Sequence, residues 1–175
     1  RKVILRMSML SFVFGSAFAQ TDYDTISATY TAGDIMTDRD FTSVDSTSDC
    51  PGVLNILIPA NAIIVGVDVE YSMTSALGAV RAEQKTEMRC TSPGGTNEGE
   101  LIGNNEWTEG TWMYSRTGLT IANGVTSNGF FPIAFELHAG RTQDGIGCGT
   151  EFQKVDDGTW TVTVIYLPVG SPNYP

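Results

Sequence analysis

Histidine is almost absent from this 175-residue chain, which contains His138 alone. A serine or cysteine hydrolase would have to use this one side chain as its general base. A zinc site of mixed cysteine and histidine ligands would have at most one imidazole. The chain also has no G-x-S-x-G elbow and no C-x-x-C pair. These absences disfavour both the triad hydrolases and the small zinc modules.

Basic residues are scarce as well. Ten lysines and arginines stand against twenty acidic residues, which gives a net charge of −10. Such a surface repels phosphate backbones, so the composition excludes nucleic acid as a partner class. An excess of acid instead favours solubility, cation binding or a saline exterior.

The long apolar run of the chain lies at its N-terminus. Three basic residues among the first six precede a mostly apolar stretch over 7–18, which ends in the small-residue motif Ala17-Phe18-Ala19. This plan predicts a secretory signal peptide over residues 1–19, cleaved before Gln20. The alternative is a retained membrane anchor, although the run is shorter than the roughly 20 apolar residues of a spanning helix. Cleavage would leave a secreted or cell-surface protein with no membrane span and a net charge of −13.

The chain contains three cysteines, Cys50, Cys90 and Cys148. In an exported protein a disulfide is expected, but three cysteines cannot all pair within one chain. We therefore expect one disulfide and one buried thiol. The spacing leaves all three pairings open.

From residue 50 onward, apolar and polar residues alternate in short runs separated by turns rich in glycine and proline. The runs expected to form strands are 53–58, 63–71, 86–91, 111–115, 119–122, 130–138 and 160–167. Residues 74–88 show a weak helical repeat and fit a long loop as well. The pattern predicts an all-β protein, a two-sheet antiparallel β-sandwich of the jelly-roll type.

The predicted sandwich domain covers residues 50–168. Residues 20–49 before it are polar and rich in threonine, serine and aspartate, with short edge strands expected at 25–30 and 41–44. Residues 169–175 form a tail.

Alternation also assigns side chains to the two faces of a strand. In the 130–138 run it places Phe131 and every second residue after it toward the core, so Glu136 and His138 point to the opposite face. That face is expected to be a solvated surface, or a ligand-binding surface if the sheet is concave there. The same rule gives one shared face in each of three other runs. These faces consist of Val65, Val67, Val69 and Tyr71 in 63–71, of Trp112 and Tyr114 in 111–115, and of Trp160, Val162, Val164 and Tyr166 in 160–167.

Residues 50–167 resemble a module of unknown function that occurs in secreted and surface proteins of Bacteroidota. The phrases that carry the resemblance are "RCTSPGGTNE", "TGLTIANGVT" and "FELHAGRT". That module often occurs in tandem or beside adhesion domains and has no assigned catalytic residues, which implies a non-catalytic role. Residues 58–74 and 88–101 are also similar to the P domain of proprotein convertases, a jelly-roll sandwich, but lack its usual Asp-Leu pair. This second likeness concerns the fold alone.

An acidic stretch precedes the sandwich. Asp34, Asp38 and Asp40 lie in it, followed by Asp45 and Asp49. Calcium takes about six to eight oxygen ligands from carboxylates and carbonyls, so the first three are candidate ligands for a structural calcium ion. The spacing fits no EF-hand loop, and the alternative is a set of solvated acids.

Trp107 lies outside every alternating run, in a glycine-rich stretch that also contains Asn105. Glycan binding needs exposed rings that stack on sugar faces, with amides or carboxylates for the hydroxyl groups. The candidate ligand-binding residues are therefore Trp107 and Asn105, together with Glu136 and His138. The sequence predicts a non-catalytic secreted or surface module whose partner is an extracellular glycan or a surface protein. A structural spacer is the main alternative, and a small hydrolase built on Glu136 and His138 is the third.

Overall fold

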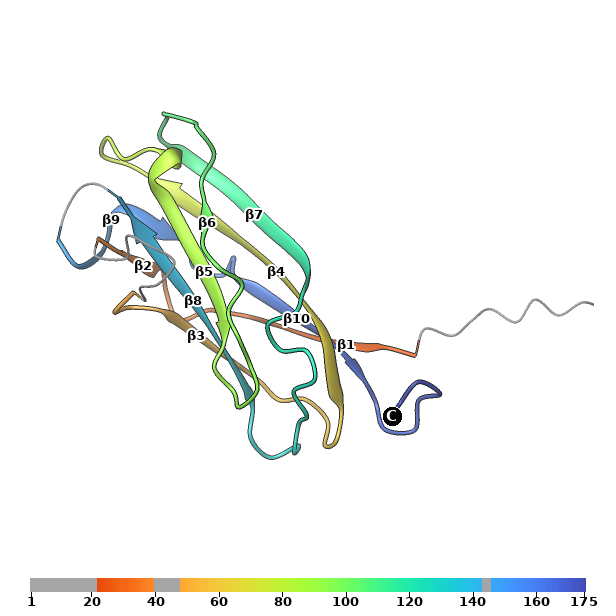
Figure 1. Cartoon of the computed structure of the whole chain (residues 1–175). Helices are drawn as coiled ribbons and strands as arrows, with labels where there is room; N and C mark the ends of the chain where they lie inside the picture. The colour runs from red at the N-terminus through yellow and green to blue at the C-terminus, as the bar shows by residue number, and fades with distance from the viewer. Residues whose placement is uncertain (1–21, 40–47, 143–145) are drawn as a thin grey trace, which may run out of the picture.

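The computed structural model describes residues 22–39, 48–142 and 146–175, which form ten β-strands and one short 3₁₀ helix (Figure 1). The strands are β1 (Asp24–Thr29), β2 (Ile35–Asp38), β3 (Gly52–Ile56), β4 (Ile63–Ser75), β5 (Gln84–Cys90), β6 (Leu101–Ile102), β7 (Gly110–Leu119), β8 (Ile133–Arg141), β9 (Cys148–Val155) and β10 (Thr161–Leu167). The 3₁₀ helix η1 spans Arg81–Glu83. Within these ranges no helix has the length and apolar character needed to cross a membrane.

The strands form two layers that face each other (Figure 1). One layer has the order β1-β10-β4-β7 and the other has the order β3-β8-β5-β6. If β2 and β9 are set aside and the remaining eight strands are renumbered along the chain, these orders become 1-8-3-6 and 2-7-4-5. This is the strand order of a jelly roll. The predicted all-β sandwich is therefore confirmed.

The strands β2 and β9 join the two layers at one end of the sandwich. β9 pairs with the last three residues of β4, and β2 pairs antiparallel with β9. β2 then contacts β8 through one parallel pair, Asp38 with Gly140. Hydrogen bonds consequently run without a break from one layer to the other.

The core fills the space between the layers. In β10, Val162, Val164 and Tyr166 are buried while the residues between them are half-buried, as alternation predicts. Trp160, just before the strand, is 1% exposed and contacts the ring of Tyr30 at 5.7 Å between centroids. Full burial of one large apolar side chain stabilises a fold by about 1.5–3 kcal/mol, so residues of this kind provide most of the stability.

A β-bulge in β4 changes which residues face the core. Gly66 pairs with Ile165 and Ile64 pairs with Tyr166, so Val65 is an extra residue without a partner in β10. The bulge reverses the alternation, and Ile64 rather than Val65 is fully buried. The prediction for Val65 is wrong. Beyond the bulge the predicted face, Val67 to Tyr71, is buried as expected.

A second irregularity lies in β7. β7 contains the whole strand predicted at 111–115 and continues to Leu119, whereas the strand predicted at 119–122 is wrong, because residues 121–122 lie in a turn. The register with β4 shifts between Arg116 and Leu119, which places an extra residue in β7. Gly118 has a φ of +68°, in the left-handed region that glycine adopts without strain, so the chain bends here without ending the strand.

One further prediction about strands needs correction. β8 starts at Ile133, so Phe131 lies in the preceding loop and is exposed instead of facing the core. β1 is an edge strand as predicted, but β2 has β9 on one side and β8 on the other. The strand expected at 41–44 lies outside the described residues.

Candidate functional site

The loop between β6 and β7, residues 103–109, is fastened to η1 by backbone hydrogen bonds. The amide of Ala82 donates to the carbonyl of Glu106 at 3.0 Å, and the amide of Arg81 donates to the carbonyl of Thr108 at 3.2 Å. At the start of the loop, the amide of Gly103 donates to the carbonyl of Gln84 at 2.8 Å. A Cβ at Gly103 would lie 1.9 Å from the carbonyl oxygen of Arg81, so glycine permits this close approach. The loop is therefore held at both ends.

Side chains reinforce the same loop. The guanidinium of Arg81 forms an ion pair with Glu106 at 2.8 Å, and its Cζ lies 5.4 Å from the ring centroid of Trp112 and 5.6 Å from that of Tyr114. Hydrogen bonds from Arg81 first, and then from Asn104 and Trp112, lower the pKa of the Glu106 carboxyl group. Trp112 and Tyr114, predicted to share one face of their strand, do so, and both are half-buried at the edge of the sandwich.

Trp107 belongs to this loop, and its side chain is 68% exposed. Asn105 lies in the same loop and is exposed too, with the Glu106 carboxylate between them in sequence. The indole ring of Trp107 is not part of the core, in contrast to the fully buried Trp160. A rigid loop that holds an aromatic ring in solvent beside amide and carboxylate groups has the chemistry needed to stack on a sugar and bind its hydroxyl groups.

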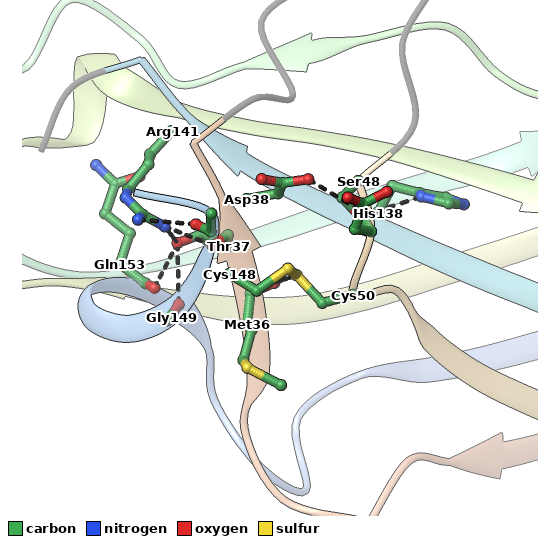
Figure 2. The surroundings of a disulfide bond; sticks show 12 residues. Met36, Thr37, Asp38, Ser48, Cys50, His138, Arg141, Cys148, Gly149 and Gln153 are labelled. Carbon is green, nitrogen blue, oxygen red and sulfur yellow. Dashed lines mark hydrogen bonds between the residues drawn. A yellow bond between two sulfur atoms is a disulfide. The ribbon is translucent and has the colours of Figure 1, made fainter. Parts of the chain in front are cut away.

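His138 does not lie on a solvated face. It is 3% exposed, and its Nδ1 lies 3.1 Å from Oγ of Ser48 (Figure 2). Its Nε2 lies 2.9 Å from a carboxylate oxygen of Glu136. The prediction of a solvent-exposed outer face is wrong for His138, because the segment around Ser48 covers this part of β8. Glu136 itself remains half-buried.

The covering segment is fixed by a disulfide between Cys50 and Cys148, at the start of β9 (Figure 2). The amide of Asp49 also donates to the Asp38 carboxylate at 2.9 Å. The third cysteine, Cys90, is free and buried, and burial raises the pKa of its thiol. One disulfide and one buried thiol were expected, and the structure selects Cys50–Cys148 among the three open pairings.

Ser48, His138 and Glu136 form a chain of hydroxyl, imidazole and carboxylate groups, as in a catalytic triad. The two members that would carry the chemistry are nevertheless inaccessible, since Ser48 is 4% exposed and His138 is 3% exposed. A substrate carbonyl cannot reach the Ser48 oxygen in this arrangement. The sequence did not reveal Ser48 as a partner because 90 residues separate it from His138.

The three aspartates proposed as calcium ligands are not shown to meet. Asp34 accepts from Lys154 at 2.8 Å and from the amide of Asp157 at 3.0 Å, and these hydrogen bonds, that of Lys154 above all, lower the pKa of its carboxyl group. Asp38 lies at the other end of β2, about 13 Å away along the strand, and Asp40 lies outside the described residues. Among the residues placed by the structure, no group of three acids, histidines or cysteines could hold a metal ion. Calcium binding stays a prediction.

Comparison with known proteins adds to the picture of the fold alone. No family model matches the chain, and no curated protein matches it. Solved structures that are similar include the C-terminal CBM6 of the laminarinase LamC from Zobellia galactanivorans, with 12% identity, a TM-score of 0.41, and coverage of 81% of this chain and 99% of that one. Latent PorU from Porphyromonas gingivalis has 12% identity and a TM-score of 0.44, and the match covers 94% of this chain and 16% of PorU.

A serine protease of Aeromonas sobria is similar at 14% identity and a TM-score of 0.43, over 82% of this chain and 26% of the protease. The chain therefore spans only a small part of the two larger proteins. At these identities and TM-scores, the likenesses carry no inference about function.

Proposed function

We propose that the protein is a non-catalytic extracellular binding module that recognises a carbohydrate through the loop at residues 103–109. The observation that carries the proposal is Trp107, which is 68% exposed on a loop held by backbone hydrogen bonds and by the Arg81–Glu106 ion pair. Exposure of a large aromatic ring costs free energy, and here the fixed loop holds the ring in solvent.

The rigidity of the loop favours binding. A ligand that docks on a flexible loop must first order it, and that entropy is lost from the binding free energy. The hydrogen bonds to η1 order residues 103–109 in advance. The indole ring of Trp107 would stack on the apolar face of a sugar ring, and Asn105 would bind its hydroxyl groups.

Two features of the structure support a non-catalytic, exported protein. The Cys50–Cys148 disulfide is of a kind that persists in oxidising compartments outside the cytosol. The hydroxyl–imidazole–carboxylate chain of Ser48, His138 and Glu136 is closed to substrate. Its contacts fasten the segment around Ser48 to β8, which is a structural role.

The proposal is tested by retention of the protein on a panel of insoluble and soluble polysaccharides. We expect retention on at least one of them, and we expect Trp107→Ala to weaken it about tenfold, the loss typical of one stacked aromatic ring. Met113→Ala is the matched control, since Met113 is equally exposed but lies on the outer face of β7. Retention unaffected by Trp107→Ala would contradict the proposed site.

The absence of retention on every polysaccharide would contradict carbohydrate recognition as a whole. A surface protein as partner, or a spacer role without a ligand, would then be the better interpretation. Pull-down of cell-surface proteins by wild type and by Trp107→Ala separates these two, because only a binding role through this loop depends on the indole ring.

A further inference from the structure

Part of one end of the sandwich is built from segments without charged side chains, although the chain contains twenty acidic residues. Four segments meet at this end, and each is uncharged: residues 57–67, 90–97, 117–135 and 168–175. Three contacts show that the segments are neighbours. Ile63 and Thr126 form a β-bridge, and the amide of Thr96 donates to the carbonyl of Ile121 at 2.8 Å. The Tyr174 hydroxyl donates to the carbonyl of Asn61 at 2.7 Å.

A short loop at this end presents two phenylalanines to solvent. Phe130 is 87% exposed and Phe131 is 73% exposed. The Asn128 side chain fixes their backbone, because its Oδ1 accepts hydrogen bonds from both phenylalanine amides at 2.9 Å. The Ser127 hydroxyl donates to the carbonyl of Ile58 at 2.8 Å and ties the loop to the residues after β3. This loop is therefore held by hydrogen bonds, as is the one that contains Trp107.

Gly129 explains how the loop fits so closely. Its φ is +75°, and a Cβ at this position would lie 2.7 Å from the Cβ of Ala60. Only glycine combines that backbone conformation with that approach. The two phenylalanine side chains consequently have a fixed base on a neighbouring loop and are not free to fold back onto the core.

A shallow hollow of about 160 Å³ lies beside Phe131, with room for about one sugar ring. It is lined by Ser92, Pro93, Val125, Thr126, Asn128, Phe131, Pro132 and Ile133. An aromatic ring lies on its rim together with neutral hydrogen-bonding groups. The Asn128 Nδ2 group has no partner among the described residues, and Thr126 is exposed. Ser92, two prolines and apolar side chains form the rest of the lining.

We propose that the uncharged hollow beside Phe131, together with Phe130, is a second carbohydrate site and that it selects neutral sugars. The lining favours a sugar over a lipid surface, because amide and hydroxyl groups lie beside the aromatic ring and a bilayer interior would leave them unpaired. It favours a neutral sugar, because no lysine or arginine lines the hollow to bind a carboxylate or sulfate. The inference rests on the proposed function for its ligand class, but it depends on different residues.

The second site lies at the opposite end of the molecule from Trp107. β4 joins the two ends: Ser75 pairs with Gly110, which follows the Trp107 loop, and Ile63 pairs with Thr126, which precedes the phenylalanines. Twelve residue steps separate Ser75 from Ile63, or about 40 Å in an extended strand. One molecule with both sites would therefore cross-link two polysaccharide chains.

The test uses a soluble neutral glucan and a soluble uronic-acid polymer as probes, with four proteins: wild type, Trp107→Ala, Phe130→Ser/Phe131→Ser, and all three substitutions together. We expect wild type to bind and precipitate the neutral glucan. Either set of substitutions alone should weaken binding about tenfold and abolish precipitation, and the combination should abolish binding. Met113→Ser is the control, and all variants should keep the wild-type Tm because the replaced side chains are exposed.

The other outcomes are distinguishable. If Phe130→Ser/Phe131→Ser binds and precipitates the glucan like wild type while Trp107→Ala does not, the second site is wrong and the proposed function stands. If the phenylalanine variant alone loses binding, the second site stands and the Trp107 site is wrong. Binding of the uronic-acid polymer through the phenylalanines overturns the selectivity for neutral sugars. A change from dimer to monomer in the phenylalanine variant, without loss of glucan binding, shows an interface between copies and overturns the inference.

Discussion

The guanidinium of Arg116 lies 2.5 Å from the carboxylate of Glu98, and both side chains are largely buried. Arg116 belongs to β7 in one layer, and Glu98 follows β5 in the other. The same guanidinium donates to the hydroxyl of Tyr71 at 2.9 Å. This pair connects the two layers at the edge formed by β7 and β6, and these two strands do not pair with each other in the part of the chain that the structure describes.

We predict that Arg116→Met lowers the free energy of unfolding by about 3–5 kcal/mol, because it leaves the Glu98 carboxylate buried without its partner. Denaturant unfolding measures this loss in the free energy of unfolding. The paired variant Glu98→Gln/Arg116→Met should recover much of the loss. Lys154→Met is the control, since its pair with Asp34 is more exposed and should contribute at most about 1 kcal/mol. An unchanged free energy of unfolding in Arg116→Met would contradict the structural role of the pair.

Alkaline pH should destabilise the fold through Tyr71. Burial raises the pKa of its hydroxyl group from 10.0 to about 12, so the folded state favours the neutral form more strongly than the unfolded state does. Its contribution to stability is therefore complete below pH 10 and declines as the pH rises from 10 towards 12. Burial of the Tyr114 hydroxyl raises its pKa too and acts in the same direction.

The measurement is the urea midpoint as a function of pH, for wild type and for Tyr71→Phe. The variant is expected to be less stable at neutral pH, since Arg116 and Thr86 lose a hydrogen-bond partner. Its stability should nevertheless decline less steeply above pH 10. Equal slopes for the two proteins would show that Tyr71 does not titrate in this way.

Removal of the disulfide should cost more than removal of most single contacts. Cys50 and Cys148 are 98 residues apart, and a cross-link over a loop of this size restricts the unfolded chain by an entropy worth about 3–5 kcal/mol. Cys50→Ser/Cys148→Ser should lower the Tm accordingly, and a reductant should affect wild type but not the variant. Thiol titration of unfolded, non-reduced wild type should find one thiol, that of Cys90; a count of three would contradict the disulfide.

The rigidity of the Trp107 loop depends on Gly103. We predict that Gly103→Ala displaces the loop, because its Cβ would overlap the carbonyl of Arg81, and that it weakens polysaccharide retention while Trp107 is still present. Gly66→Ala in β4 is the matched control, since its Cβ would meet its nearest neighbour at an ordinary 3.6 Å. Tryptophan fluorescence anisotropy and retention measure the effect. Full retention by Gly103→Ala would show that the close approach is not needed.

The parts of the structure that could be predicted from sequence are those determined locally. Alternation assigns the faces of β10 and of β4 beyond Val65, because successive side chains of a strand point to opposite sides. Trp107 was recognisable by the lack of such a pattern around it. The bulges at Val65 and near Gly118 were not predictable, because each arises from the register with a neighbouring strand that the local sequence does not contain.

The site at His138 shows the same limit over a longer range. Its position in β8 is local information, and the opposite face from Phe135 is the correct one. Ser48 buries His138 on that face, although it lies 90 residues away in the sequence. The segment around Ser48 is held by the Cys50–Cys148 disulfide, whose second cysteine is also distant in the sequence. Phe131 was misassigned for the opposite reason: the alternating pattern extends to residues that precede the start of β8.

The pairing of β1 with β10 has a mechanical consequence. Asp24 lies opposite Tyr166, so the outer ends of the first and the last strand are neighbours at one end of the sandwich (Figure 1). A pulling force applied at these two points would peel β1 from β10 one hydrogen bond at a time, a mode of rupture that needs little force. Extension would then continue only through residues outside the cross-link, which include β2, β9 and β10, because the Cys50–Cys148 bond keeps the chain between the two cysteines closed. Under tension the molecule would yield first at β1 and would keep the strands from β3 to β8 within a closed loop.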